Sequence, residues 1–311
     1  MVCASIAFIG VFILTFTGIG LPYSDTAVSV DGGSMAQKST IPNLAHFVYV
    51  VADPEGKINF RFSDFVSVFS ALHFWKPDEI LLHTNASDTM LDAARQGKSG
   101  KWSRLLLTLP NLSVISAAVP THAGNGKKIE NTEHASDFVR VEAVRQFGGI
   151  YVDFDVFALR DLRVLRESAF HAICGRQIDG TINSGTFLSA KGSKLINHWA
   201  EEMHRVYDGG WIMHGNDVAT GLANRLVAEP GEMLIMERQA FAPVGWTREE
   251  ATRLFEVHGE TDANVPQEWL EDSMTLEDDS PNATSYDWAT SWSSTYLLHA
   301  FTPGRFGATP K

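Results

Sequence analysis

One segment restricts the fold of this chain more than any other: an expected helix that ends at a double glycine and leads directly into an apolar strand. Apolar side chains recur at helical spacing over residues 138–144, and Ser136 before them is a suitable N-cap. Gly148 and Gly149 provide the left-handed exit that helix C-termini favour. Residues 150–157 then have strong β-propensity, so we expect one continuous strand there.

The chain before this segment alternates between strand and helix patterns. Strands are predicted over residues 45–51, 79–84 and 112–119, and a helix with apolar residues near helical spacing is predicted over 60–74. This alternation is typical of an α/β layer, in which helices cover a sheet of parallel strands. We therefore expect an α/β fold with a mostly parallel central sheet flanked by helices.

The N-terminus has a different character from the rest of the chain. Residues 2–22 contain no charged side chain, and about 20 apolar residues suffice to span a bilayer as a helix. We expect residues 1–22 to be a signal anchor that stays in the membrane or, alternatively, a cleaved signal peptide. Residues 23–40 are rich in Ser, Thr, Asp and Gly, which predicts a flexible stem, and residues 41–311 are expected to form one domain.

Three Asn-x-Ser/Thr triplets follow the apolar segment and fit a body in the lumen of the secretory pathway, at Asn85, Asn111 and Asn282. The expected location is the Golgi or another secretory compartment, as a single-pass type II membrane protein, or alternatively outside the cell. The formal charge of -12 argues against nucleic acid as a partner, because phosphate binding rests on clustered Lys and Arg. A nucleotide ligand is still compatible with this charge, because a metal ion supplies positive charge locally.

The expected strand over 150–157 carries two carboxylates in apolar surroundings. Period-two alternation sends Asp153 and Asp155 to the same side, where they would repel each other and lose hydration. A divalent cation relieves both costs, and Mg²⁺ or Mn²⁺ also binds phosphate oxygens readily. The alternative is that one Asp caps a loop and the other lies at the surface.

The wider pattern around these residues is more specific than the two carboxylates. A Ser-Asp-x-x-Arg sequence over residues 136–140, followed by Gly-Gly-Ile-Tyr-x-Asp-x-Asp over 148–155, closely resembles glycosyltransferase family 32, the DXD-containing sugar transferases. That family includes α-1,4-galactosyltransferases, the yeast initiating α-1,6-mannosyltransferase and, more distantly, clostridial glucosylating toxins. The resemblance implies a GT-A fold, a nucleotide-sugar donor, Mn²⁺ or Mg²⁺ as cofactor, and transfer with retention of the anomeric configuration.

The resemblance also implies roles for single residues. Asp153 and Asp155 would be the catalytic residues and metal ligands, with Asp155 binding the metal directly and Asp153 facing the ribose and sugar. Asp137 and Arg140, one helical turn apart, would hold the hydroxyls and phosphate of the donor, although such a pair can also be a surface ion pair. Tyr151 would lie next to the nucleotide, or serve in packing alone.

Weaker similarities extend the match over much of residues 41–301. Tyr49 stands where the family commonly has a Trp that can stack on the base, and core packing is the alternative. His299 would complete the metal sphere or contact the diphosphate, or be structural. Asn183 and Asp217 lie in turn-like Asn-Ser-Gly and Gly-Asn-Asp triplets, and either could contact the donor or the acceptor.

Together these features predict a metal-dependent enzyme that transfers a hexosyl group from a UDP- or GDP-sugar to a glycan or glycolipid, with retention. Two other functions remain open. The protein could be an inactive, membrane-tethered binder of sugars or nucleotide sugars. It could also resemble haloacid-dehalogenase phosphatases, whose first Asp is a nucleophile. Those enzymes have Thr or Val where this chain has Phe157, and their motif lies on an early strand.

Overall fold

The computed structural model describes residues 41–53, 56–255 and 294–301. Within this part, residues up to Trp246 and those from 294 to 301 form one compact unit, whereas helix α10 (Arg248–Phe255) belongs to a second. The expected signal anchor over 1–22 and the stem over 23–40 lie outside the described residues. In the described part of the chain, no helix is both long and apolar enough to cross a membrane.

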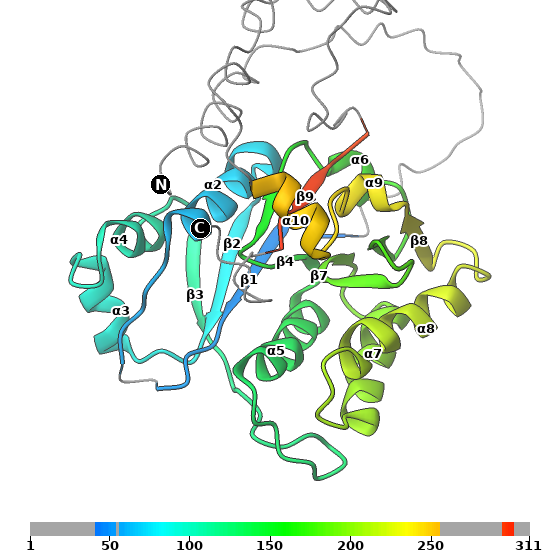
Figure 1. The fold of residues 1–311 in the computed structure, drawn as a ribbon, viewed down its shortest axis with the longest axis horizontal. Helices are drawn as coiled ribbons and strands as arrows, with labels where there is room; N and C mark the ends of the chain where they lie inside the picture. Colours follow the sequence, from blue (N-terminus) through cyan, green and yellow to red (C-terminus); the bar gives the residue numbers. More distant parts are fainter. Residues whose placement is uncertain (1–40, 54–55, 256–293, 302–311) are drawn as a thin grey trace, which may run out of the picture. The chain divides into compact units, whose positions relative to one another are not determined.

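The compact unit is built on a seven-stranded sheet in the order β3-β2-β1-β4-β7-β6-β8 (Figure 1). Its strands are β1 (Leu44–Tyr49), β2 (Glu79–Thr84), β3 (Leu112–Ser116), β4 (Gly149–Val152), β6 (Ala172–Arg176), β7 (Ile182–Ser189) and β8 (Met233–Met236). Strand β7 runs antiparallel to both of its neighbours, and all other neighbouring pairs are parallel. The expected α/β fold with a mostly parallel sheet is confirmed.

Helices cover both faces of the sheet (Figure 1). One face packs against α2 (Phe62–Trp75), α3 (Asp88–Arg95), α4 (Lys101–Leu107), α6 (Arg163–Arg166) and α9 (Arg238–Phe241). The other packs against α5 (Thr132–Phe147), α7 (Lys194–Val206) and α8 (Val218–Leu226). Strand alternation explains the two cores, because Phe47 points to the first face and Val48 to the second.

Helix α5 begins a full turn earlier than the sequence predicts. Its N-cap is Asn131, and Ser136, the expected N-cap, lies inside the helix, where its Oγ donates a hydrogen bond to the Thr132 carbonyl. Serine is common at caps, but it can also donate to a carbonyl one turn back within a helix, and this explains the wrong boundary. The C-terminus agrees with the prediction, because the helix ends at Phe147 and Gly148 has a φ of 68°.

The expected continuous strand over 150–157 is wrong, because the chain turns between Val152 and Val156. The amide of Val156 donates to the carbonyl of Asp153 at 3.1 Å and closes this turn. Ser67 of α2 reinforces it, because its Oγ lies 2.6 Å from the Val156 carbonyl and 3.4 Å from that of Asp153. The two aspartates of the motif therefore lie in a turn rather than on one face of a strand.

After the turn, the chain enters a separate two-stranded sheet. Strand β5 (Val156–Ala158) pairs antiparallel with β9 (Leu297–His299), and Val156 stands opposite His299 in the register. The amide of Ala300 donates to the Asp155 carbonyl at 2.9 Å, which continues this pairing. The pairing carries His299 to the turn that holds Asp155.

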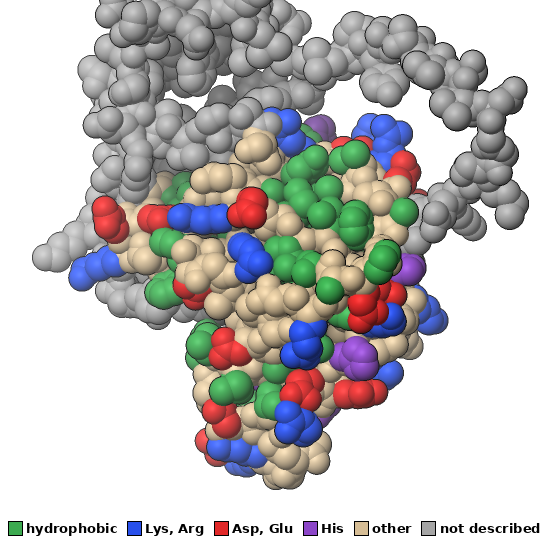
Figure 2. Space-filling model, turned by 90° about the vertical axis from the view of Figure 1, so that its right-hand side faces the viewer, with side chains coloured by type: hydrophobic (Ala, Val, Ile, Leu, Met, Phe, Trp, Pro, Cys, Tyr) green, Lys and Arg blue, Asp and Glu red, His purple; other side chains and the backbone are tan. Residues whose placement is uncertain are grey.

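The surface shown in Figure 2 carries both signs of charge. Lys and Arg side chains are interspersed with Asp and Glu among the described residues of this face. Opposite charges that alternate over a surface give it no strong field of a single sign. A site for an anionic ligand on this face must therefore rely on local groups.

Candidate functional site

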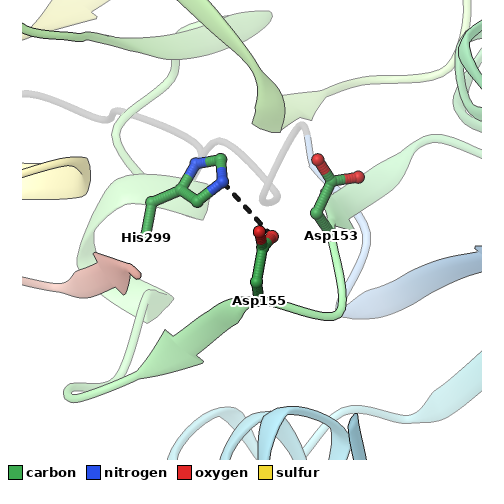
Figure 3. A group of neighbouring side chains, drawn as sticks. All are labelled: Asp153, Asp155 and His299. Carbon is green, nitrogen blue, oxygen red and sulfur yellow. Dashed lines mark ion pairs between the residues drawn. The ribbon is translucent and has the colours of Figure 1, made fainter. Parts of the chain in front are cut away.

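The turn after β4 and the end of β9 bring together three side chains of the kinds that can ligate a metal (Figure 3). Ligand atoms of Asp153, Asp155 and His299 all lie within 4.8 Å of one another, and His299 Nε2 is 3.3 Å from Asp155 Oδ1. The side chains of Asp153 and Asp155 are 23% and 20% exposed, whereas that of His299 is 4% exposed. Solvent therefore reaches the carboxylates, and the imidazole forms an inner wall.

Gly185 of β7 lets these groups lie against the backbone of the strand. A Cβ atom at this position would lie 2.6 Å from Asp153 Oδ2 and 2.7 Å from His299 Cε1, which is closer than real Cβ contacts. Its backbone also holds the turn, because the Asp153 amide donates to the Gly185 carbonyl at 2.9 Å. A glycine here permits the close approach of these two side chains, and this role was not predicted from the sequence.

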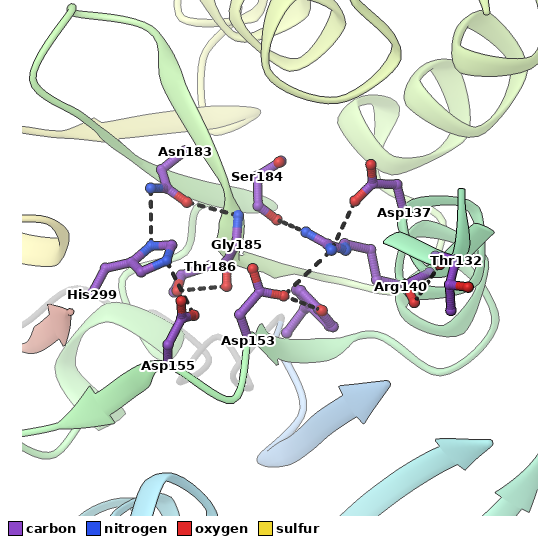
Figure 4. A network of polar contacts seen from close by, with 12 residues as sticks. Thr132, Asp137, Arg140, Asp153, Asp155, Asn183, Ser184, Gly185, Thr186 and His299 are labelled. Atoms are coloured by element: carbon purple, nitrogen blue, oxygen red, sulfur yellow. Dashed lines mark hydrogen bonds and ion pairs between the residues drawn. The ribbon is translucent and has the colours of Figure 1, made fainter. Parts of the chain in front are cut away.

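Arg140 of α5 connects the carboxylates of the helix and the turn (Figure 4). Its Nη2 lies 2.7 Å from Asp137 Oδ1 and 3.4 Å from Asp153 Oδ1. Its Nη1 donates to the Ser184 carbonyl at 3.1 Å, and its guanidinium lies 4.7 Å from the centre of the Tyr151 ring. Arg140 and Asp137 thus form an inward-facing ion pair rather than a surface pair.

Tyr151 is buried beneath this pair, where its hydroxyl donates to Asp153 Oδ1 at 2.5 Å. Burial raises the pKa of the Tyr151 hydroxyl well above its ordinary value, so it remains a donor. The ring supports the guanidinium of Arg140, and the hydroxyl orients Asp153. The structure therefore brings Tyr151 into the site as a support for the charged groups.

The charged groups of the site differ in how well the protein stabilises their ionised forms. Burial opposes ionisation of Asp137, but Arg140 and His214 outweigh it, and the pKa of Asp137 lies below its ordinary value. Burial and the neighbouring Asp155 raise the pKa of Asp153 despite the attraction of Arg140. Added positive charge at the turn would favour the ionised form of Asp153.

The segment after α7 contributes two residues that the sequence did not single out by role. His214 and Asn216 belong to the π-helical turn η1 (Met213–Asp217), a kind of turn frequent at functional sites. His214 Nε2 lies 2.8 Å from Asp137 Oδ2, and Asn216 Oδ1 accepts from the Ser184 hydroxyl at 2.6 Å. Asp217, which we expected to bind the donor, makes neither contact and precedes α8.

Two further expected residues occupy different positions. Asn183 lies in strand β7 rather than in a turn, and its Nδ2 is 3.0 Å from His299 Nδ1. Tyr49 packs its ring against Phe60 at 4.4 Å and against Phe154 of the turn at 6.1 Å. The structure thus joins Asn183 to the group of Asp153, Asp155 and His299, whereas Tyr49 contacts the turn through Phe154.

The donor set suits a divalent cation. Two partly exposed carboxylates supply the oxygen atoms that Mg²⁺ and Mn²⁺ prefer. His299 Nε2 is buried and, among the described residues, lacks a hydrogen-bond partner. Unsatisfied buried polar atoms are uncommon in folded proteins, and a ligand is one explanation for them.

Comparison with known proteins agrees with this geometry. Residues 68–171, about a third of the chain, match the family model described as a glycosyltransferase sugar-binding region containing the DXD motif. The chain is 25% identical over 237 residues to glucan organizing enzyme 1 of Cryptococcus neoformans var. grubii serotype A, covering 70% of this chain and 58% of that protein. It is 26% identical over 133 residues to an uncharacterized protein of Arabidopsis thaliana, covering 40% of this chain and 20% of that protein. The chain thus spans less than two thirds of either relative.

Solved structures that align with the chain include three transferases. PaToxG glycosyltransferase aligns at 14% identity with a TM-score of 0.45, over 60% of this chain and 70% of that chain. Mouse xyloside xylosyltransferase 1 aligns at 13% identity with a TM-score of 0.41, over 82% of this chain and 96% of that chain. The galactosyltransferase LgtC, in complex with donor and acceptor sugar analogs, aligns at 12% identity with a TM-score of 0.37, over 64% of this chain and 76% of that chain.

The family match and the geometry coincide in the sequence. The matched residues run from within α2 to the residue before β6, and they contain Asp137, Arg140, Asp153 and Asp155. The resemblance expected from the sequence is therefore confirmed. Residues 68–171 of this chain are thus similar to the sugar-binding region of the DXD-containing glycosyltransferases.

Proposed function

We propose that this protein transfers a hexosyl group from a nucleotide sugar to a glycan or glycolipid, with a divalent cation and with retention of the anomeric configuration. One observation carries the proposal. The carboxylates of Asp153 and Asp155 converge beside the Arg140–Asp137 ion pair, and all four residues lie inside the segment that matches the family. A cation site next to a fixed positive group suits a ligand that carries a diphosphate.

The residues of the site divide the recognition of such a donor. Asp155 and Asp153 would hold Mn²⁺ or Mg²⁺, which when bound neutralises charge on the leaving nucleoside diphosphate. Arg140 would face the phosphate, and Asp137, held by Arg140 and His214, would accept hydrogen bonds from sugar hydroxyls. Because these side chains are fixed by one another, they would need little rearrangement when the donor binds.

The acceptor and the setting are part of the proposal. One relative bears the name glucan organizing enzyme, which favours a polysaccharide or another glycan as the acceptor of this chain. We further propose that the protein has a GT-A-type fold and works in the secretory pathway, where sugar nucleotides and nascent glycans meet. The apolar segment over 1–22 would anchor it as a type II membrane protein or direct it for secretion.

The test is metal-dependent turnover of a donor by the full chain. A panel of UDP- and GDP-hexoses with Mn²⁺ or Mg²⁺ should contain a donor that is transferred to a glycan acceptor, or slowly hydrolysed without one. The Asp155→Asn variant should lose about a hundredfold or more in rate, because removal of a group that supports charge in the transition state has effects of this size.

A matched surface variant provides the control. Asp92 lies on α3 with a side chain 64% exposed, so Asp92→Asn removes the same charge away from the site and should leave turnover unchanged. Binding of a donor without any transfer or hydrolysis would instead identify a sugar-nucleotide binder. Release of phosphate from simple phosphomonoesters would point to a phosphatase. Equal rates for Asp155→Asn and the native protein would reject the proposal.

A further inference from the structure

Three consecutive large apolar side chains are exposed where the chain enters the π-helical turn η1. Trp211, Ile212 and Met213 are 51%, 53% and 40% exposed, whereas the next residue, His214, is buried. The other exposed large apolar residues of the described chain occur singly, at Val164, Val227 and Trp246. Exposed apolar side chains that gather in one place mark surfaces that bind something, so this segment is a candidate binding surface.

The protein holds this segment in a defined position at both of its ends. Before it, the side-chain amide of Asn125 donates to the Tyr207 carbonyl at 2.8 Å. After it, the amide of Asp217 donates to the Ile212 carbonyl at 3.1 Å. A surface that is ordered before a ligand arrives loses little conformational freedom on binding.

Two imidazoles connect Trp211 to the carboxylate that would hold the donor sugar. The ring centre of the indole lies 5.2 Å from that of His134, which in turn lies 4.8 Å from that of His214. His214 Nε2 is 2.8 Å from Asp137 Oδ2, and its ring stacks on Phe138 with an interplanar angle of 5°. The position of Trp211 relative to Asp137 is therefore set by packed side chains.

The strand order separates Trp211 from Tyr49. Tyr49 ends β1, the two aspartates of the turn follow β4, and β4 lies between β1 and β7 in the sheet. The turn η1 is attached to β7, because Asn216 Oδ1 accepts from the Ser184 hydroxyl at 2.6 Å. A donor with its base at Tyr49 and its diphosphate at the carboxylates would extend towards η1 with its sugar.

Carboxylates border the exposed segment. Glu133 and Asp208 are both exposed. Burial lowers the pKa of His134, the ring against which the indole packs, whereas these two carboxylates oppose the shift. Negative groups here disfavour contact with an anionic membrane surface. They can accept hydrogen bonds from hydroxyl groups, and an indole offers a flat apolar face to the C–H groups of a sugar ring, so the surface suits a neutral glycan.

We propose that Trp211 binds the acceptor, a neutral glycan, by stacking its indole on a sugar ring, and that Ile212 and Met213 extend this surface. The inference rests on the proposed function, since only a transferase needs an acceptor. Trp211 then contributes to the affinity for the acceptor, and not to the affinity for the nucleotide sugar or the cation. Hydrolysis of the donor by water does not use it.

Binding can be measured on the full chain labelled with fluorotryptophan. In ¹⁹F NMR each indole gives its own signal, and the Trp211→Phe spectrum assigns that of Trp211 by its disappearance. The probes are neutral oligosaccharides of glucose, galactose and mannose, added with Mn²⁺ and either UDP or GDP. We expect at least one of them to shift the Trp211 signal. No shift with any of them would overturn the proposal.

A membrane is the competing occupant of this surface, and vesicles test it. Vesicles of anionic phospholipid that contain a spin-labelled lipid broaden the signals of nuclei close to the bilayer. We expect the Trp211 signal to remain sharp in their presence. Broadening by the vesicles, without a shift by any oligosaccharide, would identify a membrane contact and overturn the proposal.

Turnover distinguishes Trp211 from the groups that would hold the donor. In Trp211→Ala, transfer to the oligosaccharide should fall about tenfold through a higher KM for the acceptor, because an aromatic contact is lost. Donor hydrolysis and the affinity for UDP or GDP with Mn²⁺ should not change. Trp211→Phe retains an aromatic ring and should keep most of the transfer. Equal losses of transfer and hydrolysis in Trp211→Ala would indicate a structural role and reject the proposal.

The control is Val227→Ala, which shortens an apolar side chain of similar exposure, 48%, at the end of α8 and should alter none of these measurements. Failure of the proposed function is separately visible as a native chain that neither transfers nor hydrolyses any donor. The ¹⁹F shift reports binding alone, so a shift in such a chain would support the glycan site while rejecting the transferase.

Discussion

Two buried histidine sites in this protein differ in whether their hydrogen bonds are complete. His46 of β1 has a protein partner at each ring nitrogen, with Nδ1 2.9 Å from His83 Nε2 and Nε2 2.7 Å from the Gly148 carbonyl. His299 has a partner at Nδ1, whereas its buried Nε2 makes no hydrogen bond within the described part of the chain. The first site is closed, and the second is open towards the carboxylates.

A glycine lies against each histidine, and in both places the missing side chain lets the imidazole approach the backbone. At Gly149, a Cβ atom would come 2.9 Å from His46 Nε2. At Gly185, it would come 2.7 Å from His299 Cε1 and 2.6 Å from Asp153 Oδ2, so a carboxylate packs against the second glycine as well. The buried histidine whose two ring nitrogens have protein partners serves the fold, whereas the one with an unbonded ring nitrogen beside two carboxylates suits a ligand.

The largest expected effect comes from closing the open site with a methyl group. In Gly185→Ala the new Cβ would meet Asp153 Oδ2 at 2.6 Å and force the carboxylates apart. We expect turnover to fall about a hundredfold or more and Mn²⁺ affinity to fall at least tenfold, measured by donor transfer and by metal titration.

The matched control is Gly221→Ala, because this glycine lies in α8 and a Cβ there meets only the Arg225 guanidinium at 3.7 Å. It should leave turnover unchanged and raise the free energy of unfolding slightly, since alanine favours a helix by roughly 1 kcal/mol. Native turnover in Gly185→Ala would show that the close packing of Asp153 and His299 against this glycine is not needed for turnover.

The closed site predicts a dependence of stability on pH. Burial lowers the pKa of His46 to about 4, and burial with its neighbour lowers that of His83 to about 3. The unfolded chain binds these protons near pH 6.5, so the free energy of unfolding should decrease as the pH falls below 6.5 and continue to decrease towards 4. At pH 5 the loss is roughly 2 kcal/mol per histidine relative to pH 7.5, measurable by urea unfolding.

A single substitution isolates this contribution from that of other histidines with lowered pKa values, such as His134. In His83→Gln the amide can still donate to His46 Nδ1, but it does not titrate. At pH 5.5 the slope of the free energy of unfolding against pH should decrease by the equivalent of about one bound proton. An unchanged slope would mean that His83 is protonated in the folded state.

The smallest expected effect concerns the two described Asn-x-Ser triplets, which also differ in whether the side chain has protein partners. Both polar atoms of the Asn85 side-chain amide are hydrogen-bonded, because it accepts from the Val51 amide at 2.8 Å and donates to the Val51 carbonyl at 2.9 Å. Asn111 is exposed, with a φ of 58°. If the chain enters the secretory pathway as proposed, mass spectrometry should find the glycan at Asn111 and not at Asn85. The reverse occupancy would show that Asn85 is modified before it folds.

The sequence predicted the fold well where local patterns and packing agree. Strand β2 matches its predicted bounds, and the helix exit at Gly148 was correct because a left-handed residue is strongly marked. The break in the strand after Val152 could not be predicted, since both sides of it are equally apolar. Ser67 on α2 stabilises this turn through a hydrogen bond between residues far apart in the chain.

The same limit applies to the site. Asp137 and Arg140 could be paired from the sequence because they are one helical turn apart, and the family pattern pointed to His299. The roles of His214 and Gly185 in the site could not be inferred, because each depends on a contact with residues far away in the sequence. A glycine in a β-propensity run does signal close approach of another group, and this was the one available clue to Gly185.

The pairing of β5 with β9 has a consequence for the order in which the protein is made. Both aspartates and their supporting helix belong to the first half of the chain, whereas the imidazole arrives with Leu297–His299. A ribosome must therefore synthesise the chain as far as His299 before the last wall of the site exists. Synthesis that stops before residue 297 would leave a chain that has both carboxylates and Arg140 but lacks the residue that faces them.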